Sequence, residues 1–365
     1  MVAGVRVVVH QQIDVGAVVI ADQILFTRGD GGGGHIVGAG GLGSRRCGRR
    51  CGRDCSGNSV ALLASSLQAK DVKTKVKTVT YEGTKVNLGT NSLKVQFVDK
   101  LKGYEKEGYQ GMDIQGDTVI SCQNAGWISF YTYDGDKLTQ IVPPYKMDCY
   151  SKENHCNVVS LSNTYYSSED KLPLLYVSQC AKHPYKGMKD VLFVVRIAND
   201  LKSQQTVQTI HYKDENHNFG YALQWVIDRE NNVLYGYGNT INNVDVNNKH
   251  RIVKFRIPAL SESKDGIVSL TDKDLLENYL IEDTYRKPFM PIGQGLFVKN
   301  GLLFMPTGFG TAKHPSILYV WDLKTRQMQN VIDLSSSTFS EFEDCAMWRN
   351  VMLLQAQGNM FRLDF

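Results

Sequence analysis

Five residue types are missing from the first 69 positions of this chain: Lys, Glu, Tyr, Trp and Pro. The same stretch holds 14 of the 33 glycines and seven arginines, whereas all 18 tyrosines come later. A segment so poor in aromatic and long aliphatic side chains lacks the material for a packed core. We therefore expect residues 1–69 to be a disordered or mis-assigned N-terminal extension, and residues 70–365 to form the folded domain.

The folded part also lacks an excess of positive or negative charge. Beyond position 69 the chain has 34 basic and 33 acidic residues, so most of the formal net charge of +4 lies in the extension. Electrostatic capture of nucleic acid requires a strongly basic surface. We expect no nucleic-acid partner for the folded domain.

Long hydrophobic runs are absent as well. No apolar stretch approaches the roughly 20 residues that span a bilayer, which predicts that there is no transmembrane segment. Residues 60–69 have an apolar core and small residues at the end, and they are similar to the tail of a secretory signal, although they lie far from the N-terminus. Two alternatives stay open. Either these residues are a signal and the protein is secreted or lies in the periplasm or cell envelope, or they are a plain linker in a cytoplasmic protein.

The sequence has no cofactor motif with the flanking secondary structure or residue spacing that such a motif requires. The glycine-rich residues 37–44 are followed by an Arg/Cys-rich stretch without an apolar helical face, so no helix N-terminus is available to hold phosphates. Cys47, Cys51 and Cys55 do not have zinc spacing, and neither HxH nor HExxH spacing occurs. We expect no cofactor and no metal. The weak metal candidates are three histidines of predicted loops: His155, His183 and His314.

What the chain does have is a pattern that recurs after residue 105: strand, tight polar turn, strand, loop and further strands. Copies occupy residues 111–123, 222–236 and 295–307, a divergent copy occupies 155–179, and the last begins at 341. Repeats of this size built only of strands are typical of a β-propeller, whose four-stranded blades bury their faces against one another. We predict an all-β fold, a β-propeller of five four-stranded blades. Six blades is the alternative if residues 75–88 form a further unit.

Two predictions concern individual strands. The fifth blade has room for only three strands, and residues 93–100, which alternate apolar and polar side chains, are predicted to supply its outer strand. Such a strand closes the ring and removes open sheet edges. In the third blade, residues 266–270 are predicted as the fourth strand and residues 272–281 as a short helix leading to the fourth blade.

Polar side chains open the innermost strand of every predicted blade, where they point toward the axial channel. The loops at this end, such as 181–190, 239–250 and 307–316, are long, and we call it the long-loop end; the opposite, short-turn end has turns of two to four residues. Binding sites lie on loops that a rigid scaffold positions. The predicted ligand-binding residues are Gln110, Asp113, His155, Asn157, Tyr221, Gln224, Gln294 and Glu343. The structural alternative is that these side chains cap the channel through water and one another.

Carboxylates suggest an alternative function. Asp113 with Glu343 or Asp344 comes from neighbouring first and last blades, and two such carboxyls can flank a glycosidic bond. The chain resembles five-bladed glycoside hydrolases in blade count, and those enzymes carry acidic residues in three successive blades. Here the second and third blades have His, Asn, Tyr and Gln side chains at those places, which disfavours hydrolysis.

Five cysteines of the folded part leave disulfide pairing open. Cys149 and Cys156 flank one loop, Cys122 and Cys180 end equivalent strands of adjacent blades, and Cys345 is left over. Either pair could bridge in an oxidising compartment. Free buried thiols are the alternative.

Beyond Asp71 the pattern of blades resembles that of secreted β-propeller proteins of the Bacteroidetes type. This resemblance implies an exported or envelope location and no particular reaction. Aromatic and amide side chains in the long loops suit sugar rings. Our hypothesis is an exported, monomeric, non-catalytic β-propeller that binds a carbohydrate, protein or peptide at its long-loop end, with a glycoside hydrolase as the alternative. A WD-repeat scaffold is disfavoured because Gly-His and Trp-Asp pairs at fixed places in each blade are missing.

Overall fold

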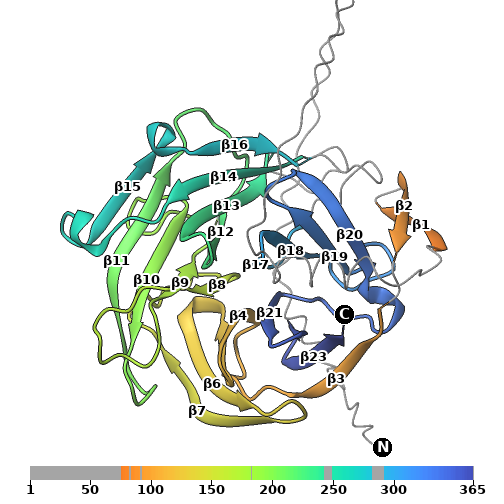
Figure 1. Cartoon of the computed structure of the whole chain (residues 1–365), viewed down its shortest axis with the longest axis horizontal. Coiled ribbons are helices and arrows are strands. Elements are labelled where there is room, and N and C mark those ends of the chain that lie inside the picture. Colours follow the sequence, from red (N-terminus) through yellow and green to blue (C-terminus); the bar gives the residue numbers. More distant parts are fainter. Residues whose placement is uncertain are drawn as a thin grey trace, which may run out of the picture. The chain divides into compact units, whose positions relative to one another are not determined.

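The computed structural model describes residues 75–81, 84–90, 93–181, 183–241, 249–281 and 292–364. The chain divides into two units, Met1–Asn58 and Ser59–Phe365. The expectations for residues 1–69, including the signal-like residues 60–69, lie outside the described residues. In the second unit five β-sheets form a ring around a central axis, which confirms the predicted five-bladed β-propeller (Figure 1).

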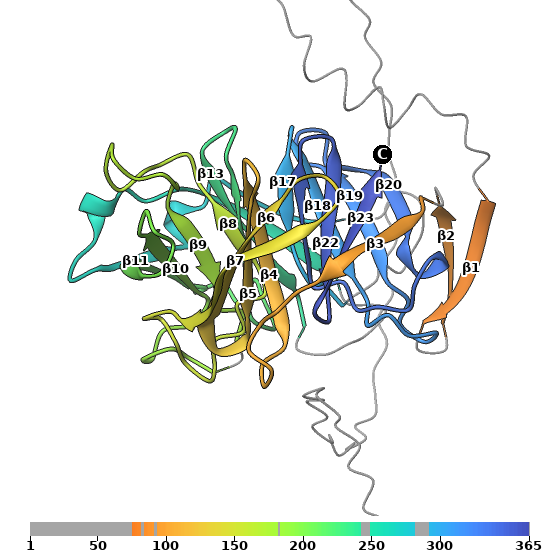
Figure 2. The same ribbon diagram turned by 90° about the horizontal axis from the view of Figure 1, so that it is seen from below.

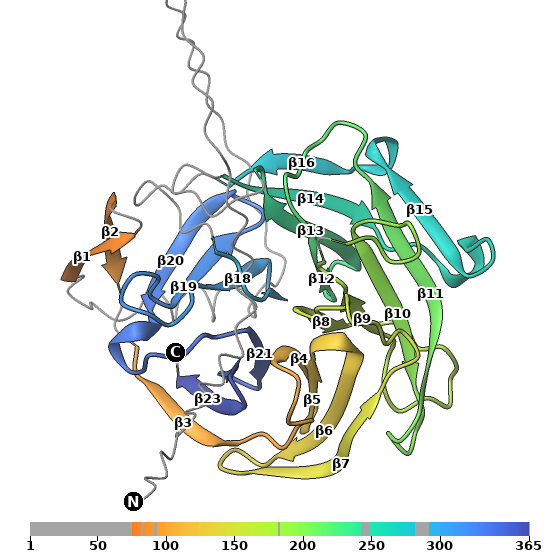
Figure 3. The ribbon, with the colours of Figure 1, turned by 180° about the vertical axis from the view of Figure 1, so that it is seen from behind.

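Each blade contains four antiparallel strands, and the innermost strands β4, β8, β12, β17 and β21 meet around the axis (Figure 1; Figure 3 shows the ring from behind). Blade 1 consists of β4 (Tyr109–Gln115), β5 (Thr118–Gln123), β6 (Trp127–Tyr133) and β7 (Leu138–Lys146). Blade 2 consists of β8 (Val159–Leu161), β9 (Leu175–Ser178), β10 (Val191–Ile197) and β11 (Gln204–Lys213). Blade 3 consists of β12 (Gln224–Asp228), β13 (Val233–Asn239), β14 (His250–Arg256) and β16 (Glu277–Leu280). Blade 4 consists of β17 (Phe297–Lys299), β18 (Leu302–Thr307), β19 (Ile317–Asp322) and β20 (Gln327–Asp333). Blade 5 consists of β21 (Asp344–Trp348), β22 (Val351–Ala356), β23 (Asn359–Asp364) and β3 (Val95–Lys100).

The hydrophobic core is divided among the five junctions between blades. Successive side chains of a strand point to opposite faces of its sheet, so a strand with few polar residues makes both faces apolar. A cluster of buried side chains fills each junction and contains residues of both adjoining blades. Examples, in the order of junctions 1–2, 2–3, 3–4, 4–5 and 5–1, are Phe130 with Val177, Leu192 with Trp225, Tyr235 with Tyr319, Phe304 with Leu354, and Leu353 with Tyr131. The stability of each blade therefore depends on both of its neighbours.

The ring closes in blade 5, where the first and last parts of the propeller pair. β3 lies antiparallel to β23, with Val95 opposite Leu363 and Phe97 opposite Phe361, on the outer side of the ring (Figure 2). This pairing confirms the predicted closure by residues 93–100. β1 (Lys75–Tyr81) and β2 (Thr84–Thr90) form a separate two-stranded antiparallel sheet, so residues 75–88 contribute a hairpin and not a sixth blade.

Blade 3 differs from the prediction. The segment predicted as its fourth strand is β15 (Ile267–Thr271), which pairs in parallel with β11 and makes the sheet of blade 2 five-stranded. Of the residues predicted as a short helix, Asp272–Asp274 do form a 3-10 helix, η3, whereas the fourth strand of blade 3 is β16, in which Glu277 forms an ion pair with Lys254 opposite it at 2.8 Å. The pairing of β15 and the strand at β16 were predicted wrongly because the two strands have five and four residues. Segments this short do not separate a strand period from a helical one.

Candidate functional site

The predicted site residues of all five blades lie in the innermost strands or shortly before them. Blade 1 supplies Gln110 and Asp113, blade 2 His155 and Asn157, blade 3 Tyr221 and Gln224, blade 4 Gln294, and blade 5 Glu343 and Asp344. These residues make two groups along the channel. The two aspartates lie among the inner strands, and the amide side chains lie at the long-loop end.

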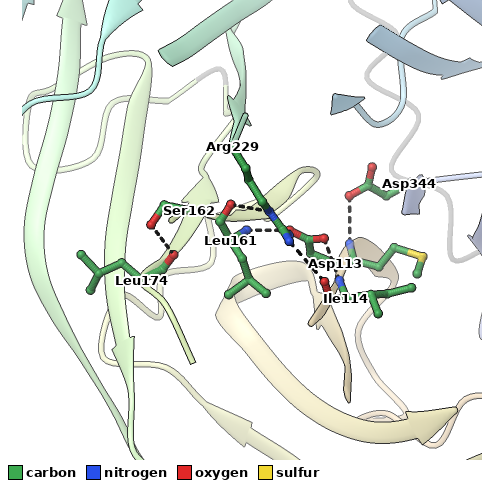
Figure 4. Close-up of polar contacts among 8 residues, drawn as sticks. Asp113, Ile114, Leu161, Ser162, Leu174, Arg229 and Asp344 are labelled. Carbon is green, nitrogen blue, oxygen red and sulfur yellow. Dashed lines mark hydrogen bonds and ion pairs between the residues drawn. The ribbon is translucent and has the colours of Figure 1, made fainter. Parts of the chain in front are cut away.

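Asp344 ties three inner strands together. Its Oδ2 accepts a hydrogen bond from the Met112 N–H of blade 1 at 2.9 Å (Figure 4). Its Oδ1 accepts from the Leu296 N–H of blade 4 at 3.1 Å. Oδ1 also accepts from the N–H of Cys345 at 2.9 Å. The residue is fully buried, and desolvation, with the nearby charge of Asp113 as a smaller cause, raises the pKa of Asp344 well above its usual range.

Asp113 makes the corresponding connection between blades 1, 2 and 3. Its Oδ2 accepts from the Leu161 N–H at 2.6 Å, and its Oδ1 accepts from the N–H of Ile114 at 2.7 Å. Arg229, in the turn after β12, forms an ion pair with the same carboxylate (Figure 4). The guanidinium also donates to the carbonyl oxygens of Leu161 at 2.8 Å and Ile114 at 3.3 Å.

Arg229 is a site residue that the sequence did not indicate. It stands in the tight turn between β12 and β13, at the short-turn end, where a charged residue is usually an exposed turn residue. Its side chain is only 25% exposed because it reaches across the channel to blades 1 and 2. Nothing in its local sequence separates it from the exposed turn residue Arg349 of blade 5.

Amide side chains from three blades meet at the long-loop end. The Asn157 Nδ2 and the Gln224 Nε2 both donate to the carbonyl oxygen of Gln294, at 3.0 and 2.8 Å. The Gln294 Nε2 in turn donates to the Gly308 carbonyl at 3.0 Å and to the Glu341 carboxylate at 2.7 Å. We call Asn157, Gln224, Gln294 and Glu341 the amide network. It unites blades 2 to 5, and Glu341 was not among the predicted residues.

The amide network has more acceptors than its own donors satisfy. The side-chain oxygens of Asn157 and Gln224 are buried and have no hydrogen-bond partner among the described residues. The same holds for the side-chain oxygen of Gln110, whose main-chain oxygen accepts from the Gln355 side chain at 2.7 Å. These three residues are 3%, 6% and 5% exposed, so the unpaired oxygens are a substantial desolvation cost unless another group donates to them.

Titratable groups around the amide network have shifted pKa values. Burial, followed by the charges of Glu341 and Asp344, raises the pKa of Glu343 well above its usual range, and burial also raises the pKa of Glu341. The imidazole of His155 has exposed surface, yet the surrounding protein desolvates it and lowers its pKa to about 4. Beside Gln224, burial raises the pKa of the Cys180 thiol to about 12. The long-loop end therefore combines neutral imidazole and thiol groups with carboxyls that resist ionisation.

The metal candidates are not brought together. Among the described residues no three His, Cys, Asp or Glu side chains are close enough to share a metal ion, so His155, His183 and His314 do not form one site. His250, at the end of the predicted loop 239–250, lies in β14.

The cysteines of the described residues are all free thiols. The predicted pairs Cys149 with Cys156 and Cys122 with Cys180 are not disulfide-bonded in this structure. Asn154 is in contact with both members of the first pair: its Oδ1 lies 3.2 Å from the Cys156 Sγ and its Nδ2 lies 3.8 Å from the Cys149 Sγ.

The short-turn end has a cavity of about 230 Å³. Apolar side chains of Ile114, Phe297, Val298 and Met347 line it together with Arg229, Glu230, Lys299 and Arg349. Its cations already have partners in the protein, because Lys299 pairs with Glu230 at 2.6 Å and Arg349 with Asp117 at 3.6 Å.

The described part of the chain contains no helix that is both long and apolar enough to cross a membrane.

Comparisons with known proteins show no family for this chain. No protein-family model and no curated protein matches the chain. Among solved structures, a glutaminyl cyclase of Myxococcus xanthus is 10% identical, with 75% of this chain and 97% of that chain covered and a TM-score of 0.44. A tail fibre of a Staphylococcus aureus phage is 14% identical, with 74% of this chain and 52% of that chain covered and a TM-score of 0.41. These similarities concern the fold and carry no argument about function.

Proposed function

We propose that this β-propeller is a non-catalytic recognition protein that binds a carbohydrate or a peptide at the long-loop end of its channel. One observation supports the proposal most. The aspartates suited to catalysis hold neighbouring blades together, whereas the buried amide oxygens of Asn157 and Gln224 have no partner in the described protein. Amide groups orient a polar ligand through hydrogen bonds and supply neither a nucleophile nor an acid.

The alternative, glycoside hydrolysis, requires two free carboxyls on opposite sides of the scissile bond. Asp113 and Asp344 each use both oxygens on main-chain N–H donors, and Asp113 also binds Arg229. Glu341 and Glu343 both come from the approach to β21, so they reach a ligand from the same blade. The arrangement therefore favours recognition over bond cleavage.

Aromatic side chains at the long-loop end of blade 1 support a sugar or peptide ligand. Trp127 stacks on Tyr104 with ring centroids 4.1 Å apart, and the ring of Tyr150 meets Trp127 edge-on at 6.4 Å. All three side chains are partly exposed. Apolar ring surfaces beside hydrogen-bonding groups bind the C–H faces of sugars and the side chains of peptides.

Export is the second part of the proposal. It rests on the signal-like residues 60–69 and on the resemblance of the blade pattern to secreted propellers of the Bacteroidetes type. Expression of the full chain in a bacterium, followed by cell fractionation and N-terminal sequencing, tests it. A mature N-terminus near Lys70 in the exported fraction supports export, and an unprocessed chain confined to the cytoplasm contradicts it.

The binding proposal is tested with glycan and peptide arrays probed with the full chain. Each array hit is then incubated with the protein, and release of reducing ends or of peptide fragments is measured. We expect binding without release, and no loss of binding in Asp113→Asn protein that remains folded. Release that both Asp113→Asn and Glu343→Gln abolish would overturn the proposal in favour of a hydrolase.

A further inference from the structure

We infer that the cavity at the short-turn end is a second binding site, which takes the carboxylate of a small organic acid whose apolar part is about the size of a benzene ring. The inference goes beyond the proposed function, because this site lies at the opposite end of the channel from the amide network. It does not depend on what the long-loop end binds. The carboxylate belongs to a free acid or to the last residue of a peptide, and the experiment separates these two sources.

Inner strands of four blades build the cavity. Its lining residues lie in β4, β17 and β21 and in the turns that follow β12 and β21, so blades 1, 3, 4 and 5 contribute. Phe297 and Met347 line it with side chains that are only partly buried. Because contact between water and apolar surface is unfavourable, a ligand whose apolar part covers these side chains gains binding free energy.

The volume of the cavity limits the size of the ligand. A cavity of about 150 Å³ with apolar walls is large enough to bind benzene. The cavity at the short-turn end has about 230 Å³, which is room for a benzene-sized group and a short chain that carries a charged group. An oligosaccharide is too large for it.

Arg349 supplies the charged part of the site. Its ion pair with Asp117 is loose, because the separation of 3.6 Å exceeds the length of a hydrogen bond. The same Asp117 Oδ1 already accepts a hydrogen bond from the Trp348 Nε1 at 2.9 Å. The Arg349 guanidinium stacks on the Trp348 ring, with its Cζ 4.2 Å from the ring centroid, and this contact uses no N–H group. The N–H donors of Arg349 thus have no hydrogen-bond acceptor among the described residues and can bind a ligand.

The other two cations of the cavity are neutralised within the protein. Lys299 pairs with Glu230 at 2.6 Å, and Arg229 binds Asp113 and two carbonyl oxygens (Figure 4). Selection of the ligand therefore depends on one guanidinium, whose planar N–H groups match the two oxygens of a carboxylate. A single cation favours a singly charged acid over a polyanion, which requires several cations.

The experiment is isothermal titration calorimetry of the full chain with two matched pairs of probes. One pair is phenylacetate and its uncharged amide, phenylacetamide, and the other is N-acetyl-Gly-Gly-Phe and its C-terminal amide. We expect the acid of at least one pair to bind about tenfold or more tightly than its amide, because only the acid forms charge-assisted hydrogen bonds with Arg349. Each pair that shows the preference identifies a source of the carboxylate. Acetate, which lacks the ring, should bind about tenfold or more weakly than phenylacetate.

Variants connect the preference to the site. Arg349→Asn is expected to reduce acid binding by about tenfold and to leave amide binding unchanged. This variant should fold, because Arg349 has a φ of 55° and Asn300 stands in the corresponding turn of blade 4 with a φ of 52°. Asp117→Asn removes the carboxylate that competes with the ligand, so it should tighten acid binding by about threefold.

Arg326→Asn is the matched control. Arg326 also has a φ of 55°, stacks on the ring of Tyr279 at 4.3 Å and pairs with Glu277 at 3.1 Å, but it does not line the cavity. Its substitution should leave acid binding unchanged. Thermal melting verifies that every variant is folded, and the comparison of acids with amides needs no variant at all.

Equal binding of acids and amides overturns the inference, and so does an acid preference that folded Arg349→Asn protein retains. Acetate that binds as tightly as phenylacetate overturns it too, and so does the absence of binding by every probe at millimolar concentration. None of these results changes the outcome of the glycan and peptide arrays, so the inference and the proposed function succeed or fail separately.

Discussion

At the scale of single residues, Asp344 is the clearest case of a carboxyl that holds the fold. Asp344→Ala removes the acceptor for the N–H groups of Met112, Leu296 and Cys345 in a fully buried place. We expect a loss of about 2–4 kcal/mol in the free energy of unfolding, measured by urea denaturation. Asp136→Ala, at an exposed turn position, is the matched control and should change stability by less than about 0.5 kcal/mol. Equal stability of the two variants would contradict the structural role of Asp344.

Arg229 and Asp113 form a pair whose contribution can be isolated. Arg229→Met leaves the buried Asp113 carboxylate without its cation, and we expect a loss of about 2–4 kcal/mol in the free energy of unfolding. The double variant with Asp113→Asn should recover about half of that loss, because no buried charge is then left unpaired. Arg256→Met, which breaks an exposed ion pair with Glu262, should cost about 0.5 kcal/mol or less. Additive losses in the double variant would show that the pair is not coupled.

Glu343 gives the stability of the protein a predictable dependence on pH. Its pKa is raised in the folded state, so between its usual value near 4.5 and the raised value the folded state binds more protons than the unfolded state. The contribution of Glu343 to the free energy of unfolding is therefore fully present below this pH window and is lost as the pH rises through it. Glu343→Gln does not titrate at this position, so we expect the variant to gain stability relative to the parent protein between about pH 5 and pH 8. Urea unfolding at both pH values measures the difference, and a constant difference would contradict the raised pKa.

At the scale of elements, closure of the ring by β3 is the contact that makes the propeller one structure. Val95 is buried against the core between blades 4 and 5, and its neighbour Lys94 is exposed. Val95→Asp should lower the free energy of unfolding by about 3 kcal/mol, because it buries a charge without a partner. Lys94→Asp places the same side chain on the solvent side and should be nearly neutral.

The open edge that results from a detached β3 gives a second measurement. An unpaired edge of β23 offers its main-chain groups to another copy, so Val95→Asp protein should form concentration-dependent oligomers in sedimentation velocity experiments. A Val95→Asp protein as stable and monodisperse as Lys94→Asp would contradict the closure.

The elements also show where prediction from sequence succeeds and fails. Residues 93–100 could be predicted as the closing strand because residues 93–97 alternate apolar and polar side chains and one blade lacked a strand. β15 and β16 could not be assigned correctly, because a strand of four or five residues gives no reliable period and its partner strand is decided by tertiary packing. The local sequence of β15 does not indicate that it pairs with β11 of blade 2 and not with blade 3.

At the scale of the whole molecule, the repeat predicted the five blades, and the predicted site residues lie in the inner strands or shortly before them. The roles of those residues could not be predicted, because they depend on which main-chain groups of other blades come within hydrogen-bond distance. Asp113 and Gln224 both belong to inner strands, yet the carboxylate of Asp113 binds N–H donors and Arg229 through both oxygens while the side-chain oxygen of Gln224 has no partner among the described residues. Arg229 lies in the turn after β12, so the pattern gave no reason to select it, whereas Glu341 precedes β21 as Gln294 precedes β17 and could have been selected by the same pattern.

This division of the channel leads to one account of the molecule: the aspartates and Arg229 hold the blades together along the axis, and we propose that the amide network at the long-loop end recognises a ligand. The most direct test is calorimetric titration of an array hit into the parent protein and into Gln224→Leu protein, with mass spectrometry of the ligand afterwards. The account predicts a complex that Gln224→Leu weakens by about tenfold or more, and a ligand recovered with unchanged mass. Cleaved ligand, or full affinity in Gln224→Leu protein that is folded, would contradict it.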